Sequence, residues 1–336
     1  MRKKIFLFVF LFGYLYAAAG VQAEERVLRT FWICWENDTL LQTDREFSNG
    51  LKLTWISKDF EKSRDNVLFG WMPSIRKSGF KHMFSYSLRQ DVFTPDDAKR
   101  VDLDINDRPF AGYLNFEVGS HSLNEYRMSS FSLSLGVVGP MSLAEQAQKF
   151  IHDDEHEPSD QGWARQLKNE PAVQIMYESR NKLTFFGRNK GLGFDLITHI
   201  GGGLGNVYTY ANAGFQVRLG WNLPRDFGQP LLRPGGSSGV IVFERDSGRG
   251  RQAHDGVYIF VALDGQFVPR NIFLDGNTFT DSHNVKKELL TNNIQIGCGI
   301  KVENLYLNVA YAKWSRTFKT QKNYQAYLIM SLAFSY

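Results

Sequence analysis

Several features that define common protein classes are scarce or missing in this 336-residue sequence. Beyond residue 23 there is no apolar run of the length that a membrane-spanning helix needs, which argues against a helical membrane protein. Only two cysteines occur, so the chain can form one disulfide at most. It contains no internal repeat and no low-complexity tract. A repeat array and a compositionally biased, disordered chain are therefore excluded.

The first residues have the pattern of a secretory signal peptide. Arg2, Lys3 and Lys4 precede the apolar run 5–16, and small residues stand at the positions that signal peptidase requires around residues 21–23. We expect residues 1–23 to be removed, which leaves 36 Lys and Arg against 35 Asp and Glu. A nearly neutral mature chain gives no support to nucleic-acid binding or to a polybasic surface.

The last residues alternate between apolar and polar side chains, as a half-buried strand does. The even-numbered positions carry the apolar side chains, namely Tyr324, Ala326, Leu328, Met330, Leu332, Phe334 and Tyr336. A secreted chain that ends on such a strand is typical of outer-membrane β-barrels, in which lipid-facing and lumen-facing residues alternate. A soluble β-sandwich alternates too. The 27 Phe, 14 Tyr and 7 Trp and the many long alternating segments favour the barrel.

Alternation of this kind predicts an all-β protein, a twelve-stranded antiparallel transmembrane β-barrel in the outer membrane formed by residues 24–336. The predicted strands are 29–38, 46–58, 79–91, 107–121, 126–138, 168–180, 190–203, 205–221, 253–268, 283–299, 301–315 and 322–336. With both termini in the periplasm, connections after odd-numbered strands are extracellular. The long segment 223–256 then falls on the periplasmic side, where turns are normally short. Either the strand count is off by one there or the connection is unusual.

The two cysteines are predicted to face opposite sides of the barrel wall. Cys34 alternates with Glu36 and Asp38 and is predicted to face the lumen, whereas Cys298 shares a face with isoleucines and is predicted to face lipid. A disulfide across a barrel wall is geometrically unfavourable. We therefore expect two separate thiols.

One segment, residues 139–152, has a helical pattern. Ser142 and Glu145 form a capping box, and good helix formers continue to His152. Glu145, Gln148 and His152 share a polar stripe, and we expect the apolar side chains to pack against the wall, namely Leu143, Ala147, Phe150 and Ile151. The helix could be a lid or plug with a solvated histidine, or it could present His152 for proton transfer.

Polar clusters lie at the predicted extracellular ends of the strands. Residues 36–39 and 43–50 offer the oxygen ligands that calcium prefers, although the same residue types form tight turns. Residues 89–100 contain cations that could hold phosphate groups or belong to a solvated loop. The acidic run 153–157 is predicted to be solvated, with one carboxylate able to orient a histidine.

Taken in order, these motifs resemble the outer-membrane lipid A 3′-O-deacylase family. The segments that carry the resemblance are Asn37-Asp38, residues 44–50, Gln90–Pro95, Asp107–Tyr113, the Gly139-Pro140 helix with Gln148 and His152, and Trp163 with Gln166–Pro171. The resemblance runs from about residue 30 to the C-terminus. It implies a calcium-dependent esterase that removes the 3′-acyloxyacyl group of lipid A, with its active site between the barrel wall and the loop helix.

The resemblance also implies roles for individual residues. His152 matches the general base, Asp38 the calcium-binding carboxylate, Asn37 and Gln148 polar residues of the same site, Ser48 a position that can hold threonine, Lys99 or Arg100 the substrate-side cation, and Glu157 a site glutamate. Expected partners are lipid A or lipopolysaccharide and the outer membrane, and we expect a monomer. Two rivals stay open, namely another outer-membrane lipid esterase such as a phospholipase and a non-enzymatic plugged barrel.

Overall fold

The computed structural model describes residues 29–38, 46–57, 80–98, 102, 104–151, 160–187, 190–231, 233, 236 and 255–336. Its strands are β1 (Thr30–Asn37), β2 (Glu46–Ile56), β3 (Lys81–Thr94), β4 (Ala111–Leu123), β5 (Arg127–Val138), β6 (Glu170–Phe186), β7 (Leu192–Gly205), β8 (Tyr208–Trp221), β9 (Gly256–Asn271), β10 (Leu290–Val302), β11 (Leu305–Trp314) and β12 (Gln325–Ser335). Its helices are η3 (Pro140–Ser142), α2 (Ala144–Ile151), α3 (Asp160–Trp163) and α4 (Ile272–Asp275). The predicted signal peptide, residues 1–23, lies outside the described residues.

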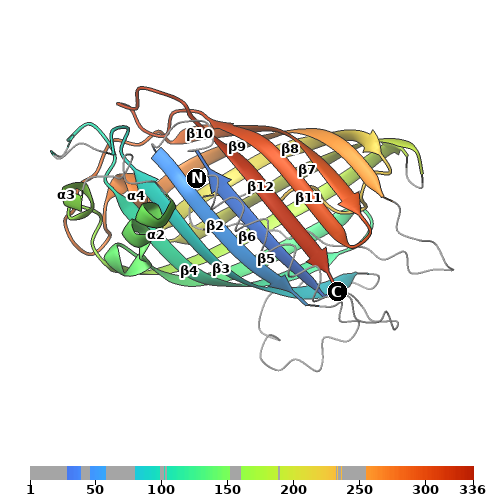
Figure 1. Ribbon diagram of the computed structural model, residues 1–336, viewed down its shortest axis with the longest axis horizontal. Helices are drawn as coiled ribbons and strands as arrows, with labels where there is room; N and C mark the ends of the chain where they lie inside the picture. Colours follow the sequence, from blue (N-terminus) through green and yellow to red (C-terminus); the bar gives the residue numbers. More distant parts are fainter. Residues whose placement is uncertain are drawn as a thin grey trace.

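The twelve strands form one closed antiparallel barrel in which each strand pairs with its sequence neighbours (Figure 1). The barrel closes where β1 pairs with β12, so that Thr30 lies opposite Ser335. Closure gives every strand a partner on both sides, which a lipid-exposed sheet requires. The twelve-stranded barrel is thus confirmed, and among the described residues no helix has the length and apolarity to cross a membrane. The largest boundary error is at β10, which begins at Leu290 rather than at residue 283.

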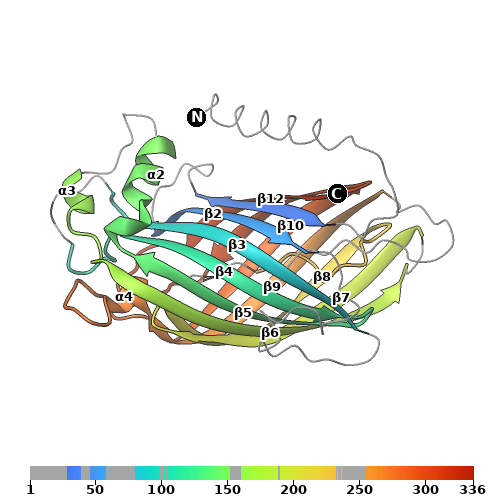
Figure 2. The ribbon, with the colours of Figure 1, turned by 90° about the horizontal axis from the view of Figure 1, so that it is seen from below.

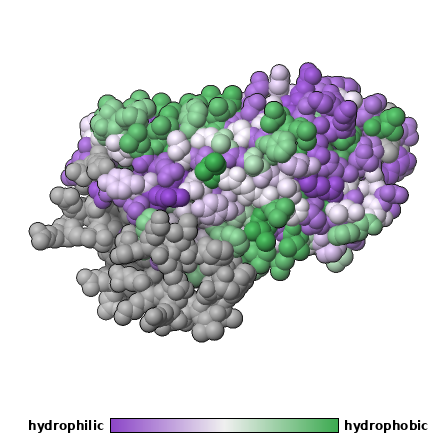
Figure 3. All heavy atoms as spheres, turned by 180° about the vertical axis from the view of Figure 1, so that it is seen from behind, coloured by the Kyte–Doolittle hydropathy of each residue, from purple (hydrophilic) through white to green (hydrophobic). Residues whose placement is uncertain are grey.

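Side chains alternate across the wall as the sequence predicts. In β9, Val257, Ile259 and Val261 are exposed on the outside, whereas the residues between them are buried inside. Figure 3 shows apolar patches on the wall, and hydrophilic side chains gathered toward the end that carries the helices, here called the helical end. The two cysteines also follow the alternation, because Cys34 is buried and Cys298 is exposed. Both thiols are free. This confirms the prediction of two separate thiols.

Charged side chains inside the barrel are arranged in ion pairs. Lys52 contacts Glu117 at 2.9 Å, and Arg89 contacts Asp91 at 2.8 Å, with all four side chains almost fully buried. Buried charges are tolerated only when they are paired and hydrogen-bonded. The lumen is therefore a polar core and not a wide aqueous channel along these strands.

The connection between β8 and β9 explains the long segment that fitted poorly on the periplasmic side. The strand count is correct, and the described part of the connection turns into the barrel, where it is here called the luminal segment (described residues 223–231, 233 and 236). Arg180 donates to the carbonyl oxygens of Phe227 and Gln229, each at 3.0 Å. Arg233, which is fully buried, contacts Glu178 and Asp264 at 3.0 and 3.1 Å. The connection is thus unusual because it fills the lumen from the end opposite the helices.

The predicted helix exists, but it starts later than expected. Pro140–Ser142 form a 3₁₀ turn, and α2 begins at Ala144. The Ser142 hydroxyl donates to the Gly139 carbonyl oxygen at 2.6 Å, so the predicted capping box with Glu145 is wrong. Glu145 instead pairs with Lys149 one turn later. The extra 3₁₀ turn carries Ser142 out of the capping position.

The predicted orientation of the helix is wrong in part, although Ala147 packs against the apolar cluster of the wall as predicted. Gln148 is fully buried on the side that faces the wall, whereas Leu143 and Phe150 are 53% and 65% exposed. The prediction assumed an apolar face against the wall and a polar face toward water. A helix that lies outside a membrane barrel has a different environment, because its outer flank need not face water.

Candidate active site

Helix α2 lies outside the barrel wall at the helical end, over the ends of the early strands (Figures 1 and 2). Gly112 of β4 makes this close approach possible, because a Cβ atom there would lie 2.0 Å from Ser142 Oγ and 2.2 Å from Ala144 Cβ. The Gln90 side chain of β3 donates to the Ser142 carbonyl oxygen at 2.6 Å. The start of the helix is therefore fixed to the outer face of β3 and β4.

An apolar cluster also holds α2 at this position on the wall, which we call the helix seat. Its members come from β3, the loop that follows it, α2 and α3, namely Val92, Ala98, Phe110, Ala144 and Trp163. The rings of Phe110 and Trp163 lie 4.9 Å apart. Because the cluster joins the loop before β4 to the loop after β5, it holds α2 and α3 against the wall as one unit.

Beside the helix, the outer face carries buried polar residues in place of exposed apolar ones. We call Asn37, Ser48, Asn49 and Thr94 the outer polar patch; all four are at most 3% exposed. Cross-strand register runs from Asn37 to Asn49, from Asn49 to Val92 and from Val92 to Gly112, so the patch adjoins the helix seat. Polar groups buried on the lipid-facing side of a barrel are costly unless they are satisfied. Their presence there indicates a functional site.

Hydrogen bonds connect the members of the patch. The Asn37 side chain donates to the Ser48 carbonyl oxygen at 3.1 Å, and the hydroxyls of Ser48 and Thr94 lie 2.6 Å apart. Trp35 donates from its indole nitrogen to Asn49 at 2.7 Å. A register shift between Phe47 and Asn49 marks a bulge at Ser48, which re-aims that side chain toward Thr94. The patch is neutral and rigidly held.

The structure brings together part of the predicted site. Asn37, Asp38 and Ser48 lie at the adjoining ends of β1 and β2, and Asp38 is fully buried. Gln148 belongs to α2 and is buried, and α2 packs on the neighbouring strands β3 and β4. The other predicted site residues lie outside the described residues, namely His152, Lys99, Arg100 and Glu157.

Sequence reasoning missed three residues that shape this site. Thr94 pairs with Ser48, Gln90 fixes the start of the helix, and Gly112 provides its seat. All three fall inside the motifs 90–95 and 107–113. Alternation could have placed Gln90 and Thr94 on the same outward face of β3 as Val92, and an outward polar residue on a barrel strand is itself a signal.

The donors at the strand ends suit a hard cation. Asp38 supplies a buried carboxylate, and Asn37, Ser48 and the main chain supply amide, hydroxyl and carbonyl oxygens. Calcium accepts such oxygen ligands, whereas zinc prefers histidine and cysteine. Within the described part of the chain no three His, Cys, Asp or Glu residues cluster as metal ligands. The residues therefore fit calcium held by one carboxylate and neutral oxygens.

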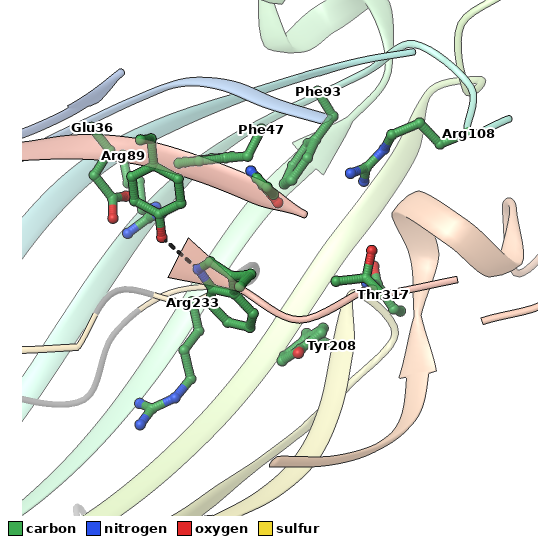
Figure 4. A pocket seen from close by; sticks show the side chains of 12 residues that line it. Glu36, Phe47, Arg89, Phe93, Arg108, Tyr208, Arg233 and Thr317 are labelled. Carbon is green, nitrogen blue, oxygen red and sulfur yellow. Dashed lines mark hydrogen bonds and ion pairs between the residues drawn. The ribbon is translucent and has the colours of Figure 1, made fainter. Parts of the chain in front are cut away.

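A second polar region lies inside the barrel, directly behind the patch. Figure 4 shows Phe47, Phe93 and Arg108 lining an open pocket at the helical end of the lumen, with Arg233 of the luminal segment on its far side. Arg108 stacks on the Phe93 ring at 4.7 Å and contacts Glu46 at 3.1 Å. The charges that line this pocket are thus engaged in ion pairs.

The remaining motifs brace the rim of the barrel. Asp107 accepts hydrogen bonds from the backbone amides of Asp96 and Arg108, and burial raises the pKa of its carboxyl above the usual value. His283 of the loop after α4 contacts the Asp107 carbonyl oxygen at 2.6 Å. Glu170, at the start of β6, accepts from the amide of Thr278 at 2.7 Å. These contacts tie neighbouring loops together around the site.

Comparisons with known proteins agree with this architecture. A sequence model of the family described as outer membrane protein LpxR matches residues 5–336. The solved structure of LpxR from Salmonella typhimurium superimposes with a TM-score of 0.72 at 15% identity, covering 91% of this chain and 99% of that one. The KdgM porin, at 6% identity, covers 91% of this chain and 99% of its own with a TM-score of 0.37. No curated protein sequence matches the chain.

Proposed function

The chain belongs to the LpxR family of outer-membrane β-barrel proteins, and from this premise we propose that it is a calcium-dependent lipid A 3′-O-deacylase. Family membership supports an outer-membrane lipid A deacylase. The single observation that carries the proposal is the outer polar patch, buried beside α2 on the lipid-facing side of the wall. A glycolipid in the outer leaflet reaches that face by lateral diffusion, whereas the filled lumen offers it no entry.

We assign the acid-base role to His152, which follows α2 in sequence. Gln148, one helical turn earlier, is buried against the wall and would orient the attacking water or the imidazole ring. A neutral imidazole can take a proton from water near pH 7 and return it to the departing sugar hydroxyl. Water attacks the ester carbonyl, the bond to the sugar oxygen breaks, and the products are a fatty acid and a free 3′-hydroxyl.

Charge that develops on the ester oxygen needs compensation in a site shielded from water. Calcium, when bound, supplies Lewis-acid stabilisation of that charge. Asp38 would hold the ion, with Asn37 and neighbouring main-chain oxygens as further donors. Ser48, whose hydroxyl is fixed by Thr94, would hold a polar group of the substrate or the water.

We assign substrate binding to the residues that flank the patch in sequence. Lys99 or Arg100 follows β3 and would contact a lipid A phosphate, by a point charge or by paired hydrogen bonds respectively. Glu157 follows the helix and is the assigned site glutamate. The helical end would face outward, as the rule for connections after odd-numbered strands predicts.

Mass spectrometry of lipid A incubated with the refolded barrel tests the reaction class. We expect loss of one acyloxyacyl unit with calcium and no loss with a chelator. Phospholipid incubated in parallel separates this activity from a phospholipase. Release of fatty acid from phospholipid alone would sink the assignment of lipid A as the substrate.

The role of His152 is tested by replacing it with alanine. We expect the rate to fall by about 10²-fold or more, because general-base catalysis contributes on this scale. His82, at the start of β3 and at the opposite end of the barrel, provides the matched control. His82→Ala should keep full activity, and full activity of His152→Ala in folded protein would refute the assigned base.

A further inference from the structure

Three large apolar side chains are exposed on the segment that carries α2. Met141, Leu143 and Phe150 are 63%, 53% and 65% exposed. Ala144 and Gln148 are turned toward the wall, and the ion pair between Glu145 and Lys149 occupies a different flank, with 2.9 Å between Lys149 Nζ and Glu145 Oε1. We call Met141, Leu143 and Phe150 the apolar flank. Leu143 immediately precedes the first residue of α2, and Phe150 lies in its last turn.

Leu143 adopts a backbone conformation that leucine normally avoids. Its φ is 59° and its ψ is 25°, in the left-handed region that favours glycine or asparagine. The residue joins η3 to α2, since its amide donates to the Pro140 carbonyl oxygen and its carbonyl oxygen accepts from Ala147. A bulky exposed side chain at a strained junction does not serve local stability. Such an outlier points to a role for the side chain itself.

The apolar flank continues the lipid-facing surface of the barrel. Leu143 follows the end of β5 by five residues, and the outer face of β5 carries Leu135, which is 54% exposed. Its cross-strand partners Phe116 and Val173 are each 48% exposed and face the same way. A helix with one apolar flank and one charged flank beside such a surface has the character of an interfacial helix.

We infer that the apolar flank inserts into the acyl-chain region of the outer leaflet and seats the active-site helix in the membrane surface. The partner is therefore the lipid acyl chains themselves. The membrane contact does not depend on catalysis. Its benefit for hydrolysis rests on the proposed function. A helix held at the depth of the acyl chains meets an ester of the surrounding glycolipid without lifting that lipid out of the leaflet.

Fluorescence quenching by brominated lipid tests the contact without any enzyme assay. A bimane label is placed at Leu143→Cys in a Cys298→Ala background, and Cys34 stays buried and unlabelled. In nanodiscs of brominated phosphatidylcholine we expect strong quenching and a blue shift. Ile105→Cys is the matched control, because Ile105 is 74% exposed in a rim loop and should face water. Equal, weak quenching at both positions would overturn the inference.

A second experiment separates the lipid contact from local folding. Asparagine tolerates the left-handed region, so Leu143→Asn should leave thermal unfolding unchanged or raise its midpoint. Its hydrolysis of lipid A in bilayers should fall roughly tenfold, the scale expected for losing one buried leucine side chain. In detergent micelles the hydrolysis rate of Leu143→Asn should change little. Ile105→Asn should hydrolyse lipid A at the wild-type rate in bilayers and in micelles.

The outcomes distinguish this inference from the proposed function. Quenching at residue 143 in a wild-type-like barrel that hydrolyses no lipid A would support the membrane contact and contradict the deacylase. Hydrolysis that is unaffected by Leu143→Asn in bilayers, together with absent quenching, would overturn the contact and leave the deacylase standing.

Discussion

Two faces of the same strand ends carry opposite chemistry. Glu36 and Arg89 point into the lumen and form an ion pair, with 3.2 Å between Arg89 Nη2 and Glu36 Oε2. Asn37, Ser48 and Thr94, on β1, β2 and β3, belong to the neutral outer polar patch. One step along a strand separates the two sets, because successive side chains point to opposite faces. The barrel thus places paired charges inside and neutral amides and hydroxyls on its outer face.

This difference has an energetic reason. Inside, a charge that loses its partner is left in a low-dielectric core, so the pairs are needed for folding. Outside, neutral amides and hydroxyls cost less to bury and can exchange hydrogen bonds with water, an ion or a substrate. Variants of the inner face should therefore change stability, and variants of the outer face should change activity.

The largest effect is expected from the carboxylate at the edge of the patch. Asp38→Asn should lower lipid A hydrolysis by about 10²–10³-fold, the scale for losing one preorganised stabiliser of developing charge. Unfolding of the detergent-solubilised barrel should change little. Hydrolysis is followed by mass spectrometry, and folding by the heat-dependent mobility of the barrel in gels.

Glu36→Gln is the matched control for that variant, because Glu36 lies within β1 and pairs with Arg89 in the lumen, whereas Asp38 follows the strand and its amide donates to the Ser48 carbonyl oxygen. It should lose stability through Arg89 and keep most of its activity. Equal loss of activity in both variants would contradict the division between the two faces.

Arg233→Met should have the next largest effect, this time on stability. Arg233 is fully buried and holds the luminal segment to Glu178 and Asp264. Removing it leaves two carboxylates without that partner, which should cost about 3–5 kcal/mol. Lys319→Met removes an ion pair with Glu288 in which Lys319 is 52% exposed, and it should cost at most about 1 kcal/mol. Denaturant unfolding measures both, and similar costs would argue against a structural role for the luminal segment.

Gly112→Ala should lower both the stability of the barrel and the rate of lipid A hydrolysis. Its added methyl group would collide with Ser142 and Ala144, so α2 must move away from the wall. We expect a stability loss of about 1–3 kcal/mol, typical of overpacking, and a roughly tenfold lower rate from the displaced helix. Gly265→Ala is the control, because the nearest atom there is 3.7 Å from the added Cβ. A normal rate in Gly112→Ala would show that the helix seat does not position the site.

The smallest effect is expected at the hydroxyl pair. Ser48→Ala removes the hydrogen bond to Thr94 and should cost about 1 kcal/mol in stability. Thr94→Ser keeps the hydroxyl and should be close to wild type. If the Ser48 hydroxyl takes part in the reaction, as proposed, Ser48→Ala should lose rate as well, and an unchanged rate would remove Ser48 from the site.

The alternation of side chains made the fold predictable, because a period of two over ten or more residues is characteristic of strands whose two faces meet different environments. All twelve strands, the closed barrel and the separate thiols follow from that pattern. The start of β10 was placed too early, because residues 283–289 belong to the loop after α4, in which Lys287 forms only an isolated bridge with Phe318. The course of the luminal segment was not predictable, since its anchors Arg180 and Asp264 are distant in sequence.

The site was predictable in its strand ends and less so in its helix. Asn37, Asp38 and Ser48 lie at the adjoining ends of the paired strands β1 and β2, so their proximity comes from the topology. The orientation of α2 was predicted wrongly for Leu143, Gln148 and Phe150, because the sequence pattern does not distinguish a water-facing flank from a lipid-facing one. The seat at Gly112 depends on a contact with Ser142, which lies on a different element, and a single sequence gives no sign of that distance.

Closure of the barrel has a consequence for how the protein assembles. Thr30 and Ser335 are 305 residues apart and contact each other through their hydroxyls at 2.8 Å. Until that seam forms, β1 and β12 each present an open edge, which hydrocarbon does not tolerate. Insertion into the membrane is thus a cooperative event that needs the first and last strands at once. A chain that lacks either strand should stay at the membrane surface as an aggregation-prone open sheet.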